Sequence, residues 1–317
     1  MKTVLQEIFD VLDDRKDEMI ALRRNFHQHP ELSFHETETA RKIAAFYDGK
    51  DCTVMTHVGG GNGILVDIQG GKPGKHIAIR ADFDALPIQE ETDVPFASTV
   101  PGVMHACGHD GHTAYMMILA DTLIQFKDQI AGTIRVIHQP AEEVTPGGSK
   151  GMIEAGCLDG IDNVFGIHVM STMEVGNVYV HPGAVHTGRA TFQVKMTGKG
   201  GHGSAPQDAN DAIVAAAQFV SSVQTIVSRR IGPFDAATVT IGSFDGKGSA
   251  NVIKETVTLA GDVRILDESL RPVVETEFRR LLAGTCEAFG ITYELDYQND
   301  YPVCMNDPEM TQLVADA

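Results

Sequence analysis

The order of the elements expected in the second half of the chain limits the possible folds more than any other feature. Between residues 185 and 297, the spacing of apolar residues predicts strands and helices in the order β-α-β-β-α-β. The strands are expected at 189–196, 237–244, 256–265 and 292–297, and the helices at 211–229 and 268–289. This order is typical of a ferredoxin-like α+β sandwich. We therefore predict a self-contained domain over residues 185–297.

The residues before this domain follow a different pattern. Short β-branched segments bounded by glycine predict strands, and amphipathic segments between them predict helices. The strands are expected at 52–57, 63–68, 76–81, 133–138 and 163–169, and the helices at 36–47 and 113–126. This alternation indicates an α/β domain with a mixed, largely parallel sheet over residues 1–184. A helical pattern begins again at Pro308, so we assign 298–317 to a return to this domain that is cut short.

Charge and length exclude several classes of protein. The 317 residues contain 25 Lys and Arg against 43 Asp and Glu, a formal net charge of −18. Such a field repels nucleic acid and anionic membrane surfaces, so neither is an expected partner. Because no apolar stretch reaches the roughly 18 residues of a membrane helix and no signal peptide opens the chain, we expect a cytoplasmic protein. The five cysteines are scattered and odd in number, which favours reduced thiols.

The segment HACGHDGH, at residues 105–112, is the strongest local indication of chemistry. Thiolate and imidazole are ligands that suit zinc, cobalt or nickel, and Cys107 and His109 stand on one side of an extended segment. The alternative is a buried cysteine beside surface histidines, because a short motif alone is only a hypothesis. We interpret the segment as part of a metal site.

Acidic side chains and a histidine follow the ends of three expected strands. They are Asp82 and Asp84 after 76–81, Glu142 and Glu143 after 133–138, and His168 at the end of 163–169. Sites in open α/β sheets lie outside the carboxyl ends of the strands, so we expect these side chains to lie near one another. One carboxylate of an adjacent pair can bind a metal while the other acts as a general base. Taken alone, such a pair is more often a solvated surface feature.

Two glycine-rich motifs point to other functions. GKGGHG at 198–203 fits the dinucleotide-binding pattern, which makes a nicotinamide oxidoreductase an alternative function. However, a Ser-Ala-Pro-Gln segment follows the last glycine, and no acidic residue occurs about 20 positions later. GGSKG at 147–151 fits the nucleophile elbow of serine hydrolases, but a proline precedes it instead of a strand. In a chain with 32 glycines, we interpret both as chance matches.

Six segments in order along the chain carry a more specific resemblance. They are RRNFHQHPELSFHE at 23–36, RADFDALP at 80–87, HACGHDGH at 105–112, QPAEE at 139–143, GIHV at 166–169 and GKGGHGSAP at 198–206. Together they resemble the dinuclear metallo-amidohydrolases of the aminoacylase and carboxypeptidase group. That group includes hippurate hydrolases, N-acyl-amino-acid amidohydrolases, indole-acetyl-amino-acid hydrolases and N-acetyldiaminopimelate deacetylases. The resemblance implies a zinc-exopeptidase-like catalytic domain that cleaves the amide bond of N-acyl amino acids or similar conjugates with metal-activated water.

The resemblance also implies a role for each matching residue. It implies two divalent metal ions per site, with zinc, manganese, cobalt and nickel all open as the native metal. The implied ligands are Cys107 shared by both ions, His109 and His168 on one ion, and Glu143 on the other. Glu142 is the implied general base, and Asp82 is the implied carboxylate that orients a ligand imidazole.

The domain over 185–297 resembles the dimerisation or lid domain of the family. The resemblance implies that His202 reaches an active site and stabilises the oxyanion, with Asn251 in the substrate cleft. The alternative for His202 is a turn histidine among glycines. A homodimer and a small-molecule N-acyl amino acid substrate are the implied partners.

The family takes a last metal ligand, a histidine, from a C-terminal segment of the catalytic domain. No histidine follows His202 in this sequence. We therefore expect the ion on Cys107 and Glu143 to be held weakly, so that one ion per chain is an alternative to two. A family member or fragment that binds metal and ligand without turnover is the alternative function.

Overall fold

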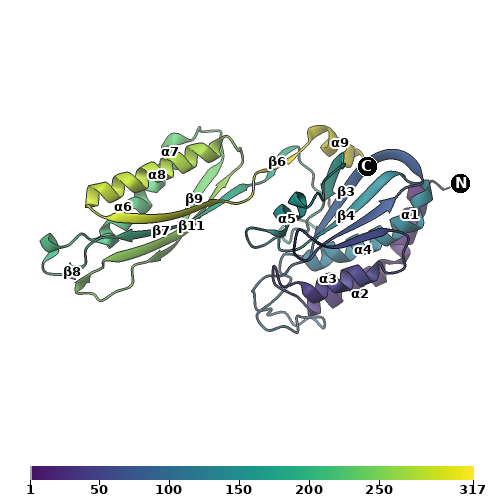
Figure 1. Cartoon of the computed structure of the whole chain (residues 1–317), viewed down its shortest axis with the longest axis horizontal. Helices are drawn as coiled ribbons and strands as arrows, with labels where there is room; N and C mark the ends of the chain where they lie inside the picture. Colours follow the sequence, from purple (N-terminus) through teal and green to yellow (C-terminus); the bar gives the residue numbers. More distant parts are fainter. Residues whose placement is uncertain (1) are drawn as a thin grey trace. The chain divides into compact units, whose positions relative to one another are not determined.

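The computed structural model describes residues 2–317, which form two compact units (Figure 1). The first unit ends at Val175 and the second begins at Gly176. This division falls a few residues before the boundary expected at 184/185. The segment 298–317 lies within the second unit, so its assignment to the catalytic domain stays a prediction.

The first unit is built on a five-stranded sheet with strand order β1-β2-β4-β3-β5. The strands are β1 (Thr53–Val58), β2 (Gly63–Gln69), β3 (Lys72–Asp82), β4 (Ala131–Gln139) and β5 (Asn163–Gly166). β3 pairs in parallel with β4 and β5, whereas the pairs β1–β2 and β2–β4 are antiparallel. The structure therefore confirms a mixed α/β sheet, and the three parallel strands place their carboxyl ends at the same edge.

Helices cover both faces of this sheet (Figure 1). They are α1 (Val4–Asp14), α2 (Lys16–Gln28), α3 (Thr37–Phe46), α4 (His109–Gln125) and α5 (Gly148–Glu154), with a short 3-10 turn at Lys127–Gln129. Because side chains alternate along a strand, neighbouring residues of β2 face opposite layers. Val66 belongs to the core that contains Met116 of α4, whereas Leu65 packs with Met152 of α5.

Two boundaries in this unit differ from the sequence prediction. α4 begins at His109 and not at 113, because the residue before it, Gly108, has a φ of 91° and the chain turns into the helix directly after it. β5 ends at Gly166, so His168 lies in an irregular segment beyond the strand. Both differences lie in the region where the expected metal ligands meet.

The second unit contains a four-stranded antiparallel sheet with strand order β12-β7-β11-β9. The strands are β7 (Gly188–Thr197), β9 (Ala237–Asp245), β11 (Thr256–Ile265) and β12 (Thr292–Asn299). The helices are α6 (Ala212–Val223), α7 (Thr225–Arg230) and α8 (Leu270–Phe289), so the helix expected at 211–229 is divided at Gln224. The element order and the strand order are those of a split β-α-β sandwich.

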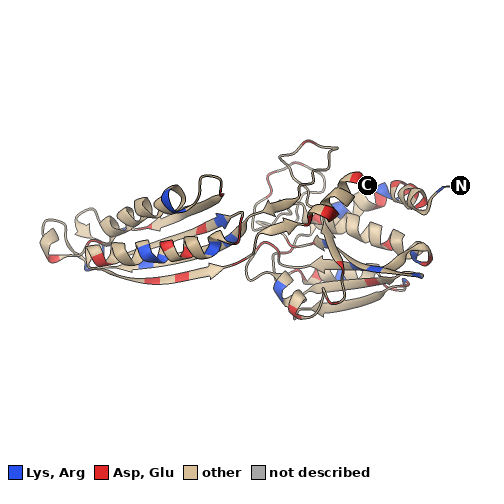
Figure 2. Cartoon of the chain, turned by 90° about the horizontal axis from the view of Figure 1, so that it is seen from above, with Lys and Arg blue, Asp and Glu red and all other residues tan. Residues whose placement is uncertain are grey.

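The two faces of this second sheet differ in chemistry. Alternate residues of β7 are buried, among them Phe192, Val194 and Met196, and they pack with Phe219 of α6 and Phe278 of α8. The residues between them, such as Gln193 and Lys195, are polar and exposed. Acidic and basic residues are distributed over both units (Figure 2).

Short elements complete the second unit. β8 (Gly201–His202) pairs with β10 (Val252–Ile253), and β6 (Gly183–His186) pairs with β13 (Cys304–Asn306). A 3-10 turn covers Pro206–Asp208, and the last helix is α9 (Pro308–Asp316). None of the helices in residues 2–317 is both long and apolar enough to cross a membrane. The cytoplasmic location stays a prediction.

Candidate metal centre

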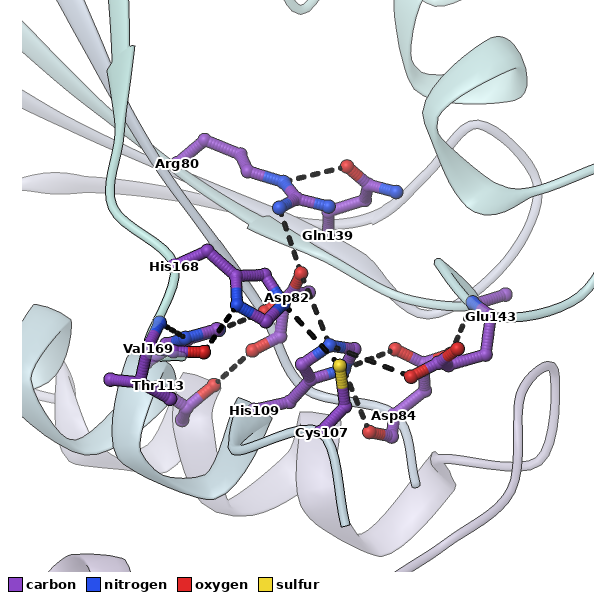
Figure 3. A network of polar contacts seen from close by, with 12 residues as sticks. Arg80, Asp82, Asp84, Cys107, His109, Thr113, Gln139, Glu143, His168 and Val169 are labelled. Atoms are coloured by element: carbon purple, nitrogen blue, oxygen red, sulfur yellow. Dashed lines mark hydrogen bonds and ion pairs between the residues drawn. The ribbon is translucent and has the colours of Figure 1, made fainter. Parts of the chain in front are cut away.

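Side chains from four segments converge beyond the carboxyl ends of β3, β4 and β5 (Figure 3). They are Asp82 at the end of β3, Glu142 and Glu143 after β4, His168 after β5, and Cys107 and His109 at the start of α4. The structure thus brings together all six residues that sequence analysis selected in this unit. Asp82 is the last residue of β3, and the polar residues that follow β4 and β5 come within a few positions of the strand ends, so the sheet itself brings them together.

Gly108 allows two of these segments to approach each other. Its φ of 91° lies in the left-handed region, which L side chains rarely adopt. A Cβ atom at this position would lie 2.3 Å from Cγ2 of Val169, the residue after His168. With glycine there, the Sγ atom of Cys107 lies 3.3 Å from Nε2 of His168.

His109 is fully buried at the centre of the cluster. Its Nδ1 lies 3.0 Å from both the backbone oxygen and Oδ1 of Asp84, which directs Nε2 toward the other ligands. Nε2 is 3.5 Å from Oδ2 of Asp82 and 3.8 Å from Oε1 of Glu143. Burial lowers the pKa of His109, but the hydrogen bonds to Asp84 and Cys107 and the nearby carboxylates outweigh it and raise the pKa to about 11. The raised pKa reflects an excess of negative charge that favours a cation at this position.

The donor atoms are close enough to share metal ions. In each of three groups, every donor atom lies within 4.8 Å of the others: Cys107 with His109 and His168, His109 with Glu142 and Glu143, and Asp82 with His109 and His112. Within the described part of the chain, Nε2 of His109 and Oε1 of Glu143 are buried without a hydrogen-bond partner. Buried polar atoms are normally satisfied, so the open imidazole nitrogen and carboxylate oxygen, with the thiol of Cys107 nearby, fit divalent ions that prefer these ligands.

Asp82 has other partners as well. Its Oδ1 lies 2.6 Å from Nδ1 of His112, and Nη1 of Arg80 lies 2.7 Å from its Oδ2. Burial raises the pKa of Asp82, but the hydrogen bond from His112 and the charge of Arg80 outweigh it and hold the pKa well below its usual range. Asp82 is therefore ionised, and it orients His112.

Asp84 holds two of the expected ligands at once. Its Oδ1 contacts His109, and its Oδ2 accepts hydrogen bonds from the backbone N–H of Glu143 at 3.0 Å and from Oγ of Ser33 at 2.7 Å. Sequence analysis placed Asp84 at this edge without giving it a role. The carboxylate that orients the His109 imidazole is thus Asp84, and the Asp-x-Asp spacing after β3 was the available signal.

The carboxyl group of Glu142 is partly buried beside a second carboxylate. Burial first, and then the charge of Glu143, raise the pKa of its carboxyl group. A carboxyl group with a raised pKa can accept and return a proton more readily near neutral pH. The site therefore contains adjacent carboxylates suited to different tasks.

His202 and Asn251 lie in the second unit, beside each other. β8 pairs with β10 so that His202 opposes Val252, and the backbone N–H of Gly203 donates to the oxygen of Asn251 at 2.9 Å. The His202 ring is exposed, and its Nδ1 lies 2.8 Å from Oγ of Ser204. In residues 198–203 the glycines lead into β8 and not directly into a helix, unlike a dinucleotide-binding turn.

Comparison with known proteins places this centre in a family. Residues 78–317 match peptidase family M20/M25/M40. The YhaA protein of Bacillus subtilis (strain 168) is 46% identical over 318 aligned residues, which cover 100% of this chain and 80% of YhaA. The N-acyl-L-amino acid amidohydrolase of Geobacillus stearothermophilus is 40% identical over 95% of this chain and 81% of its own length.

A solved structure agrees with the fold of the whole chain. The crystal structure of the Bacillus subtilis YXEP protein, a dinuclear metal-binding peptidase of the M20 family, superposes with a TM-score of 0.80 at 35% sequence identity. The match covers 95% of this chain and 78% of that protein.

Proposed function

Because this chain belongs to peptidase family M20/M25/M40, we propose that it is a metal-dependent hydrolase of the aminoacylase or hippurate hydrolase type, acting on N-acyl amino acids or similar conjugates. One observation carries the proposal. Around the buried Nε2 of His109 lie thiolate, imidazole and carboxylate donors, and within the described residues this nitrogen and Oε1 of Glu143 have no hydrogen-bond partner. The relative from Geobacillus stearothermophilus, an N-acyl-L-amino acid amidohydrolase, supports the substrate class.

We assign the metal ligands by position. Cys107 would be shared by two divalent ions, with His109 and His168 completing one site and Glu143 belonging to the other. The donor atoms of Cys107, His109 and His168 lie close together, which supports the first site. The donor atoms of His109, Glu142 and Glu143 also lie close together, which supports a second site beside the first. Zinc, manganese, cobalt and nickel all suit this donor set.

Bound ions of this kind polarise an amide carbonyl and make water more acidic. Glu142 takes a proton from the attacking water and passes it to the leaving amine, which its raised pKa favours. Asp84 keeps His109 in one orientation by holding Nδ1, and it fixes the backbone of Glu143 with its other oxygen. The chain itself therefore supplies the proton transfer and the alignment.

We assign oxyanion stabilisation to His202 and substrate contact to Asn251. His202 lies on β8 and Asn251 directly precedes β10, with which β8 pairs, and the exposed His202 ring is available to a ligand. If His202 serves the site of a partner chain, a His202→Ala chain mixed with a Glu142→Gln chain regains activity, because each mixed dimer then has one complete site. Mixed dimers without recovery would place His202 in the site of its own chain or outside catalysis.

The homodimer in this proposal is assigned to the second unit. α6 has no charged residue, and Ile213 and Val214 on it are exposed, as is Phe244 on the edge strand β9. Two chains that each carry a charge of −18 approach most easily through an uncharged surface. Pairing at an edge strand with twofold symmetry also satisfies open backbone groups.

The proposal is tested with protein reconstituted with each candidate metal and a panel of N-acyl amino acids. We expect metal-dependent release of the free amino acid, which Glu142→Gln abolishes without loss of metal. Binding of metal and N-acyl amino acid without turnover of any panel member would favour the alternative of a non-catalytic binding protein. Protein that binds no divalent metal would refute the proposal.

A further inference from the structure

A buried carboxylate outside the metal cluster contacts the turn that carries Glu142 and Glu143. Glu36 is fully buried. Its Oε1 accepts a hydrogen bond from the backbone N–H of Ala141 at 2.7 Å, and its Oε2 accepts one from Nδ2 of Asn62 at 3.2 Å. In residues 2–317 no lysine or arginine forms an ion pair with Glu36.

The turn that Glu36 contacts has an unfavourable backbone conformation. Ala141 has a φ of 48°, in the left-handed region where a residue with a Cβ atom is strained. Such a residue persists only where its surroundings hold it. Two hydrogen bonds do so here: the one to Glu36, and one from the backbone N–H of Gly148 to the oxygen of Ala141 at 2.9 Å.

Packing leaves part of this turn open. A cavity of about 460 Å³ is lined by Glu36 and Asn62 on one side and by Pro140 and Gly147–Gly148 on the other. Because Pro140 faces this open space, packing from that side does not hold the start of the turn, and the hydrogen bonds of Ala141 contribute to its position. The bond from Ala141 to Glu36 is one of two hydrogen bonds at the residue directly before Glu142.

The same N-terminal segment supports the turn from its other end. Ser33 donates from Oγ to Oδ2 of Asp84, the oxygen that also accepts the N–H of Glu143. Ser33 and Glu36 therefore hold the two ends of the segment Ala141–Glu143, one through Asp84 and one directly. This gives a role to the motif at residues 23–36, which the proposed mechanism leaves unused.

We propose that Glu36 is a positioning residue, which holds Ala141 in its left-handed conformation and thereby aims Glu142 and Glu143 at the metal ions. This inference rests on the proposed function. Burying a carboxylate without a cation costs stability, so stability alone would favour an apolar side chain at this position. The benefit is the alignment of the adjacent carboxylates.

The test compares three variants in the full chain. Glu36→Met keeps the volume but removes the acceptor of the Ala141 N–H, whereas Glu36→Gln keeps an oxygen that can accept it. Asn62→Ala is the matched control, because it removes the other hydrogen bond to the same carboxylate and leaves the turn attached. The measurements are the affinity for Co²⁺ in competition with a chelator, the visible absorption spectrum of the bound Co²⁺, and the free energy of unfolding without metal.

We expect Glu36→Met to lower the Co²⁺ affinity roughly 10- to 100-fold, as is typical when a residue behind a metal ligand is lost, and to change the spectrum. Asn62→Ala and Glu36→Gln should keep the Co²⁺ affinity and the absorption spectrum close to those of the wild type. We expect this even where their free energy of unfolding is as low as that of Glu36→Met. In active protein, Glu36→Met should lower kcat more than it raises KM, because the base is displaced while the substrate contacts remain.

Equal effects of Glu36→Met and Asn62→Ala on Co²⁺ affinity, or a wild-type spectrum in Glu36→Met, would overturn the inference. If Glu36→Met does not fold, Glu36→Asp is used in its place, because the shorter aspartate side chain ends one methylene short of Ala141. Wild-type Co²⁺ affinity in Glu36→Asp would also overturn the inference. Wild-type protein that binds no Co²⁺ would instead refute the proposed function.

Discussion

Nε2 of His112 accepts a hydrogen bond at 2.9 Å from the backbone N–H of Val169, the residue that follows His168. The other ring nitrogen of His112 lies 2.6 Å from Oδ1 of Asp82. Because Nε2 accepts, Nδ1 carries the proton and donates it to Asp82. Both nitrogens are engaged, so His112 links β3 to the segment that carries His168.

We predict that His112→Phe weakens metal binding although it removes no ligand. The ring volume stays, but the bonds to Asp82 and Val169 are lost and His168 is less well held. The expected loss is roughly 10- to 100-fold in metal affinity, measured by chelator competition. His168→Ala is the comparison, since it removes a ligand outright. If His112→Phe lost as much metal as His168→Ala, His112 would itself be a ligand.

Gly108→Ala should be destabilising for two separable reasons. A residue with a Cβ atom in the left-handed region costs about 1–2 kcal/mol. The new Cβ atom would also meet Cγ2 of Val169 at 2.3 Å. Val169→Ala in the same chain should relieve the contact and leave the backbone cost, as measured by urea unfolding against Val169→Ala alone. Full recovery in the double variant would show that the backbone conformation adds no cost.

Glu142→Gln and Glu143→Gln should fail in different ways. Loss of a general base typically lowers the rate on the order of 10² to 10⁴-fold, so Glu142→Gln should abolish most turnover while metal content stays at the wild-type level. Glu143→Gln should lower metal content itself, which elemental analysis after dialysis measures. Equal metal loss in the two variants would show that these roles are wrongly assigned.

His138 should make the fold sensitive to acid. It is fully buried on β4, with Nε2 3.0 Å from Oη of Tyr47, and burial lowers its pKa to about 3. In the unfolded chain His138 takes up a proton near its ordinary pKa of about 6.5. Its contribution to the free energy of unfolding is therefore complete above that pH. As the pH falls from there toward the pKa of His138 in the folded protein, this contribution is lost at up to about 1.4 kcal/mol per pH unit.

His138→Gln tests this expectation, because glutamine keeps a polar group near Tyr47 and does not titrate. The variant should be less stable than wild type near neutral pH, yet its free energy of unfolding should fall less steeply in mild acid. Urea unfolding over a series of pH values measures both slopes. Parallel curves would mean that His138 takes no part in the acid response.

Much of the architecture follows from short-range patterns. Alternation of apolar residues predicted β11 over Thr256–Ile265 without error, because a strand with one buried face repeats every two residues. The same local patterns located the ends of β3 and β4, and with them Asp82, Glu142 and Glu143. They did not locate the start of α4, because the spacing of apolar residues does not encode the left-handed turn at Gly108 after which the helix begins.

Local patterns in the sequence identify the types of donor at the centre and the order of the elements that carry them. Which of these atoms are already engaged in hydrogen bonds depends on how the chain folds. Glu36 meets Ala141 across 105 residues, and His112 meets Val169 across 57, so no local spacing encodes either contact. These hydrogen bonds form because the sheet brings distant segments to one edge. They distinguish the residues whose donor atoms can bind a metal ion from the residues that hold those donors in place.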